Sequence, residues 1–194
     1  MFVVDIDGTL LNGNNTISEE DKLALDEVRR QGIVVSLCTG RVKQACSEVI
    51  RRLALDGYHI FSDGAVVDST DGLKQIYARS IEESLLKQMV EYVHLKGINT
   101  IDFFSPSGYY IEPETEPWVT EIRRNFFGLK PNTVDFADLC QHEQIIKATL
   151  VLDSAEDRAK AKEFLALFKD KLRFSWTGNA TYPSLDFINI IDTG

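Results

Sequence analysis

The sequence has little that would suit a secreted or membrane-spanning protein. Its three cysteines are an odd number without Cys-x-x-Cys spacing, at Cys38, Cys46 and Cys140. We therefore expect reduced thiols in a cytoplasmic protein, with Cys38 and Cys46 as packing residues, and no disulfide framework. The sequence also lacks a signal-like segment and an apolar run of membrane-spanning length, which argues against export and against a membrane partner.

The chain has fewer basic than acidic residues. The chain has 21 lysines and arginines against 30 aspartates and glutamates, which gives a formal net charge of −9. This balance argues against nucleic acid or an anionic membrane surface as a partner. An anionic small molecule would need a locally positive binding site.

Motifs of several common enzyme classes are missing. The sequence has no Gly-x-x-x-x-Gly-Lys-Ser/Thr string, which argues against a P-loop nucleotide hydrolase. The three histidines, His59, His94 and His142, lack metal-site spacing, so we expect them at the surface or at the edge of the core. We find no internal repeat, low-complexity tract or proline-rich linker.

The first part of the chain alternates apolar runs with helical patterns. Ser18 to Asp21 forms a capping box, and residues 42–53 carry apolar side chains at three- and four-residue spacing, so both predict helices. The apolar runs predict strands buried on both faces at residues 1–4 and 33–38, and a third short strand at residues 58–61. This order predicts right-handed crossovers and a parallel sheet, which is the α/β class.

The pattern changes from about residue 66. The elements expected there are a hairpin over 66–77, a helix over 82–96, a hairpin over 98–112, and further helices and strands that end with strands near 172–177 and 184–191. This second series is of the α+β type. We therefore expect a first domain at 1–80, an inserted α+β cap domain at 81–185, and a segment at 186–194 that returns towards the first domain.

Two carboxylates follow the first apolar run. Asp5 and Asp7 are two residues apart, so they share one face of an extended strand, and Gly8 lets the backbone turn away. Carboxylates this close repel each other unless a cation or an unusual protonation state compensates. The pattern indicates a metal or acid–base site at the carboxyl end of a strand, although an aspartate there can also simply cap a turn.

A polar tripeptide follows the second apolar run. Thr39, Gly40 and Arg41 offer a hydroxyl, an accessible backbone N–H and a cation just before a predicted helix, an arrangement that can bind phosphate. Taken alone, the tripeptide is also typical of an ordinary turn. Its place at the end of the strand that neighbours Asp5 favours the phosphate-binding interpretation.

These motifs resemble those of a known family. The string Asp5-Ile6-Asp7-Gly8-Thr9-Leu10-Leu11 resembles the first motif of the haloacid dehalogenase superfamily of phosphotransferases, and Thr39-Gly40-Arg41 resembles its second. Ser62-Asp63-Gly64-Ala65 is similar to the Asn-Gly-Ala loop of the Cof-type branch, subclass IIB, with Asp63 in place of the asparagine. The resemblance implies a Rossmann-like core with an inserted cap, and a magnesium-dependent phosphatase acting on small phosphorylated metabolites, often sugar phosphates.

The resemblance also implies residue roles. Asp5 would be the nucleophile that forms an aspartyl-phosphate, and it would bind Mg²⁺ together with the backbone carbonyl of Asp7. Asp7 would transfer protons as a general acid and base. Thr39, Gly40 and Arg41 would bind phosphate, and Asp63 with Gly64 would form a possible substrate loop.

The resemblance stops before the end of the family pattern. A lysine and a Gly-Asp-x-x-Asn-Asp loop are expected after the cap, and the 194 residues contain neither. We therefore keep two alternatives. The chain is part of a longer phosphatase, or it is a truncated remnant that binds a phosphate ligand without catalysis. We expect a monomer or a weak homo-oligomer. A chain that stops at Gly194 should leave the strand of residues 1–6 with an open, apolar edge, through which it would tend to self-associate.

Overall fold

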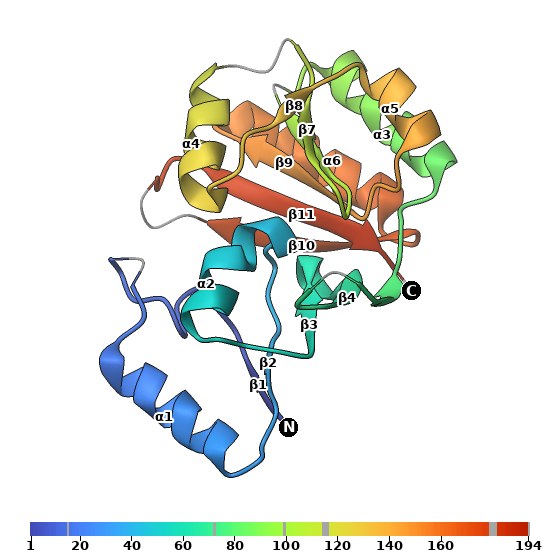
Figure 1. The fold of residues 1–194 in the computed structure, drawn as a ribbon. Helices are drawn as coiled ribbons and strands as arrows, with labels where there is room; N and C mark the ends of the chain where they lie inside the picture. The colour runs from blue at the N-terminus through green and yellow to red at the C-terminus, as the bar shows by residue number, and fades with distance from the viewer. Residues whose placement is uncertain (15, 72, 99, 114–116, 179–181, 194) are drawn as a thin grey trace. The chain divides into compact units, whose positions relative to one another are not determined.

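The computed structural model describes residues 1–14, 16–71, 73–98, 100–113, 117–178 and 182–193, with the backbone alone for 117, 123, 126 and 127. The chain divides into two compact units, Met1–Ala78 and Arg79–Gly194 (Figure 1). This division falls two residues before the predicted end of the first domain at residue 80. None of the described helices is long and apolar enough to span a membrane.

The first unit contains both parallel and antiparallel pairing. β1 and β2 are parallel, while β3, β4 and β5 form an antiparallel sheet; a parallel bridge between Cys38 and Ile60 connects the two sets. The strands are β1 (Phe2–Val4), β2 (Val35–Leu37), β3 (Tyr58–Phe61), β4 (Val66–Ser69) and β5 (Gln75–Ala78). The predicted parallel arrangement of the first strands and the predicted 66–77 hairpin are therefore present.

The helices of this unit follow local sequence signals. Ser18 caps α1 (Glu19–Arg30) by accepting a hydrogen bond from the Asp21 amide, as the capping box predicted. The helix predicted over 42–53 begins as a 3₁₀ turn, η1 (Lys43–Cys46), and continues as α2 (Ser47–Arg52).

Burial of β1 differs from the prediction. β2 is buried throughout, but Phe2 and Val3 of β1 are 45% and 44% exposed. Within the part of the chain that the structure describes, β1 is hydrogen-bonded only to β2, so its other edge has no neighbour. The prediction that both faces of this strand are buried was therefore wrong.

The second unit is a six-stranded sheet with helices on both faces. The strand order is β10-β11-β9-β6-β7-β8. The strands are β6 (Ile101–Phe104), β7 (Tyr109–Ile111), β8 (Asn132–Thr133), β9 (Lys147–Leu152), β10 (Leu172–Gly178) and β11 (Asp186–Asp192). The helices are α3 (Glu83–Lys96), α4 (Pro117–Phe127), α5 (Phe136–His142) and α6 (Ala155–Phe168).

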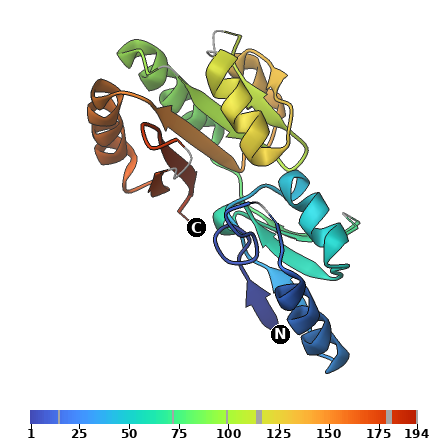
Figure 2. The same cartoon turned by 90° about the vertical axis from the view of Figure 1, so that its left-hand side faces the viewer.

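Helices cover both faces of this sheet (Figures 1 and 2). One face packs against α3, α5 and α6 in the main core, which includes Met89, Phe103, Phe136 and Phe164. The other face packs against α4 through a smaller cluster that includes Val119, Val151 and Phe187. The sheet is therefore the middle layer of this unit.

The last described strand differs from the sequence-based domain division. Residues 186–194 were expected to return towards the first domain, but β11 lies between β9 and β10 and pairs with both. Ile188 and Ile190 are fully buried in the main core, which holds this strand in the sheet. Gly194 lies outside the described residues.

His59 is more deeply buried than the sequence suggested. Its side chain is fully buried in β3, and its Nδ1 accepts a hydrogen bond from the Leu37 amide at 3.1 Å. Burial lowers the pKa of His59; nearby Asp56 opposes this shift and Lys43 adds to it. The ring is therefore neutral in the folded protein around neutral pH.

This burial predicts a pH dependence of stability. Below about pH 6.5, the unfolded chain binds a proton at His59 that the folded chain does not, so stability is present above that pH and is lost as pH falls. From about pH 7.5 to 5.5, His59 should remove up to about 1.4 kcal/mol from the free energy of unfolding. His59→Asn should show less of this loss in urea titrations, whereas His142→Asn, at an exposed position, should behave like wild type. Equal pH dependence in all three proteins would contradict the assignment.

Candidate active site

The register of β1 and β2 brings the predicted site residues to one sheet end. Val4 lies opposite Leu37 in the parallel pair, and the Cys38 amide donates to the Val4 carbonyl at 2.9 Å. Asp5 and Thr39 therefore leave their strands at the same end. This end of a parallel sheet is where open α/β folds bind ligands.

A tight turn after β1 holds Asp7 near this end. Ile6 is fully buried, and its carbonyl accepts hydrogen bonds from the Leu10 and Leu11 amides at 3.0 and 2.8 Å. Gly8 has a φ of 74°, which glycine adopts without steric cost. Asp5 and Asp7 are both exposed on either side of the buried isoleucine.

Arg41 binds Asp7 through two hydrogen bonds. Its Nε and Nη2 atoms donate to the two carboxylate oxygens at 2.8 and 2.7 Å, a bidentate ion pair. The hydrogen bond to Asp7 is the largest cause that raises the pKa of Arg41. The sequence pattern predicted a phosphate-binding role for Arg41 but not this pairing, because the two residues are 34 positions apart.

The loop of residues 39–41, here the Thr39 loop, is held by backbone contacts. Thr39 is buried, its amide donates to the Ile60 carbonyl at 3.0 Å, and its hydroxyl accepts from the Arg41 amide at 3.2 Å. The amides of Ser62 and Asp63 donate to the carbonyls of Arg41 and Thr39 at 2.9 and 3.2 Å. The Thr39 loop is thus pinned to the loop of residues 62–64.

That second loop has an unusual backbone. Ser62 and Asp63 have φ values of 53° and 57°, and Gly64 has 95°. Left-handed conformations at residues other than glycine cost about 1–3 kcal/mol and gather at functional sites. Asparagine and aspartate tolerate this conformation best, so Asp63 can occupy the position where the resemblance led us to expect asparagine.

Acidic groups outnumber cations around these loops. Partial burial raises the pKa of the Cys38 thiol, and the charges of Asp5 and Asp63 raise it further. Burial raises the pKa of Cys46 to about 12, where Arg41 opposes the shift and Asp7 and Asp5 add to it. Cys38 is exposed, so the expectation that it is a packing residue was wrong, whereas Cys46 is buried.

Asp5 and Asp7 are the residues that could hold a metal here. Among the described residues, none donates a hydrogen bond to the exposed Asp5 carboxylate, and no group of three or more His, Cys, Asp or Glu gathers to hold an ion. Mg²⁺ is commonly bound by one or two carboxylates while it keeps several waters. An Asp5 carboxylate and an Asp7 carbonyl, both oxygen donors, fit part of such a shell.

Comparison with known proteins identifies the class. A profile of the haloacid dehalogenase-like hydrolase family matches residues 2–190, so the chain belongs to this family. The sugar phosphatase BT4131 of subclass IIB superposes with a TM-score of 0.78 at 24% identity, over 100% of this chain and 70% of that one. A haloacid dehalogenase-like hydrolase from Bacteroides thetaiotaomicron superposes with a TM-score of 0.80 at 17% identity, over 100% and 71%. These likenesses show the fold.

Curated relatives match over shorter parts. The 5-amino-6-(5-phospho-D-ribitylamino)uracil phosphatase YcsE of Bacillus subtilis is 34% identical over 67 residues, which are 34% of this chain and 27% of that protein. The HMP-PP phosphatase of Cronobacter sakazakii is 25% identical over 153 residues, 77% of this chain and 53% of that protein. The chain thus spans from about a quarter to about half of these relatives.

The close approach of the two loops predicts the effect of a methyl group at Gly40. A Cβ there would lie 2.7 Å from Asp63 Oδ1, so the aspartate would have to move. Gly40→Ala should lower the free energy of unfolding by about 1 kcal/mol, the low end of the cost of overpacking, because the exposed Asp63 side chain can shift. Adding Asp63→Gly should recover most of this loss, because glycine removes the contact and also suits the positive φ.

Chemical unfolding of the two single variants and the double variant checks this coupling. Gly13→Ala is the matched control, because a Cβ at Gly13 meets nothing within 4 Å. If the effects of Gly40→Ala and Asp63→Gly on the free energy of unfolding were strictly additive, contact with Asp63 would not be the reason why alanine is unfavourable at position 40.

Proposed function

We propose that the complete protein is a phosphatase that hydrolyses phosphate monoesters of small metabolites, with sugar phosphates as the first class to test. The observation that carries this proposal is the meeting of Asp5 and Asp7 with the Thr39 loop at one end of the β1–β2 pair. Family membership and the names of the matched relatives support it. A cytoplasmic location and a monomeric or weakly self-associating state stay predictions.

Asp5 is the proposed nucleophile. Its exposed carboxylate is open to attack phosphorus: an oxygen of Asp5 forms a bond to phosphorus while the bond from phosphorus to the leaving oxygen breaks. The product is an aspartyl-phosphate and an alkoxide that needs a proton. Water then attacks phosphorus, the bond to Asp5 breaks, and inorganic phosphate leaves.

Asp7 is the proposed proton carrier. It gives a proton to the leaving alkoxide and takes one from the attacking water, which restores its starting state. While both Asp7 oxygens accept hydrogen bonds from Arg41, the carboxylate is directed at the guanidinium and not at a leaving group. The acid role therefore requires Arg41 to release at least one oxygen, which also frees a guanidinium N–H to bind the phosphoryl group.

The proposed cofactor is Mg²⁺, held by the Asp5 carboxylate and the Asp7 backbone carbonyl. When bound, it supplies positive charge that reduces repulsion between an anionic nucleophile and an anionic phosphate. The Thr39 hydroxyl and the backbone near Gly40 orient the phosphoryl oxygens. Asp63 and Gly64 remain the proposed substrate loop.

Replacing the nucleophile tests the proposal. Asp5→Asn in the natural full-length protein should abolish hydrolysis of a panel of sugar phosphates with Mg²⁺, because it removes the nucleophile with little change in volume. Asp26→Asn, which changes an exposed carboxylate on α1, should retain wild-type turnover. Near-normal activity in Asp5→Asn would rule out the covalent route, and phosphate binding without turnover in wild type would favour the non-catalytic remnant.

The leaving group should separate the role of Asp7 from that of Asp5. Asp7→Asn should slow hydrolysis of a sugar phosphate by about 10²-fold or more, because the alkoxide leaves without a proton. In the first turnover, the same variant should release p-nitrophenol from p-nitrophenyl phosphate with a much smaller loss of rate, because this leaving group needs no proton. Equal losses for both substrates in the first-turnover rate of leaving-group release would contradict proton transfer from Asp7 to the leaving group.

A further inference from the structure

Side chains replace part of the backbone ladder between β2 and β3. Beyond the bridge of Cys38 with Ile60, the Ser36 hydroxyl donates to the Tyr58 carbonyl at 2.8 Å. The Leu37 amide donates to His59 Nδ1 at 3.1 Å. At the last two positions of β2, just before the Thr39 loop, one hydrogen bond to β3 is therefore made by the Ser36 side chain and the other by the His59 side chain.

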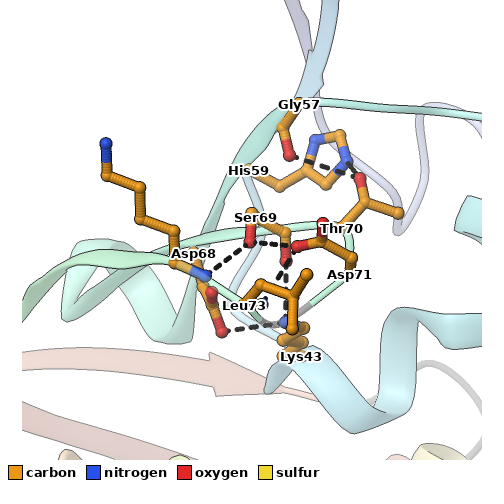
Figure 3. Close-up of polar contacts among 9 residues, drawn as sticks. Lys43, Gly57, His59, Asp68, Ser69, Thr70, Asp71 and Leu73 are labelled. Atoms are coloured by element: carbon orange, nitrogen blue, oxygen red, sulfur yellow. Dashed lines mark hydrogen bonds and ion pairs between the residues drawn. The ribbon is translucent and has the colours of Figure 1, made fainter.

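His59 links this backbone to a third segment. Because Nδ1 accepts from Leu37, the neutral ring carries its proton on Nε2, which donates to the Thr70 hydroxyl at 3.0 Å (Figure 3). Thr70 in turn lies within 3.3 Å of the Gly57 carbonyl. The contacts of the fully buried ring thus fix one tautomer and one orientation.

Lys43 makes a matching link on the other side of the Thr39 loop. Its Nζ donates to Asp68 Oδ2 at 2.8 Å and to the Ser69 carbonyl at 2.7 Å (Figure 3). Both partners in this ion pair are largely buried, and Asp68 Oδ1 has no hydrogen-bond partner among the described residues. Removing Lys43 would leave a buried carboxylate without its cation, which is strongly destabilising.

The hydrogen bonds of Lys43 and of His59 end on three consecutive residues, Asp68 to Thr70. Leu37 lies two positions before Thr39, and Lys43 lies two positions after Arg41. Through His59 and Lys43, both flanks are tied to the segment Asp68–Thr70 at the end of β4. The Thr39 loop is thus braced at both ends by one short stretch of an antiparallel hairpin.

We propose that His59 and Lys43 are positioning residues that hold the Thr39 loop in the geometry it needs to bind a phosphoryl group. This inference rests on the proposed phosphatase function. Neither side chain is assigned to contact substrate; each acts through the backbone on one side of the loop. A displacement of about 1 Å in a group that orients substrate can cost about 10²-fold in rate.

Variants of His59 test the first link in the natural full-length protein. His59→Leu removes the acceptor for the Leu37 amide, whereas His59→Asn can present Oδ1 near the position of Nδ1. We expect His59→Leu to lower kcat/KM for a sugar phosphate at least tenfold and His59→Asn to recover most of it. Amide hydrogen exchange at Leu37, followed by NMR, should be faster in His59→Leu than in His59→Asn.

Variants of Lys43 test the second link. Lys43→Met keeps the length of the side chain and removes its charge, and Lys43→Arg keeps the charge. We expect Lys43→Met to lower kcat/KM at least tenfold and to weaken binding of inorganic phosphate, with Lys43→Arg closer to wild type. Leu25→Val in α1 is the control, because it disturbs a buried contact of the same unit away from the loop.

The outcomes separate this inference from the function on which it rests. If His59→Leu and Lys43→Met match Leu25→Val in kcat/KM and in phosphate affinity, the positioning role is overturned even though wild type is active. If wild type hydrolyses no phosphate ester, the proposed function fails, and phosphate affinity together with Leu37 exchange then decides the positioning role. If wild type does not bind phosphate either, both proposals are overturned.

Discussion

The parallel register of β1 and β2 is the constraint on which the candidate site depends. Val4 opposite Leu37 makes both strands end at the same level, so Asp5 and the Thr39 loop emerge together. A shift of one residue would turn the side chains of β1 to the other face and separate these groups. The buried side chain of Ile6 helps to fix which way the aspartates point.

Arg41 supplies positive charge at a sheet end where carboxylates predominate. Asp5, Asp7 and Asp63 lie close enough to influence neighbouring thiols, and Arg41 is paired with Asp7 in the structure. A dianionic phosphate arriving here meets more carboxylates than cations. Movement of Arg41 from Asp7 towards the phosphate, together with a bound divalent cation, would reduce that imbalance in the proposed function.

Local patterns predicted the long elements, and the errors come from information that is not local. The helix predicted over 82–96 is present as α3, which ends at the left-handed Gly97, but the short α5, Phe136–His142, carries too little periodicity to stand out. Exposure of Phe2 depends on which strands flank β1, which a run of apolar letters does not specify. The pairing of Arg41 with Asp7 joins two motifs that the sequence suggested separately, and only the folded chain brings them into contact.

The central claim is that Asp5 carries the phosphoryl group during turnover. The most direct measurement is acid quenching of the natural full-length protein during hydrolysis of a phosphate ester with Mg²⁺, followed by peptide mass spectrometry of the N-terminal segment. Our account predicts a phosphoryl group on Asp5 that disappears in Asp5→Asn. Active turnover with the phosphoryl group on another residue, or with direct transfer to water and no phosphorylated Asp5, would contradict it.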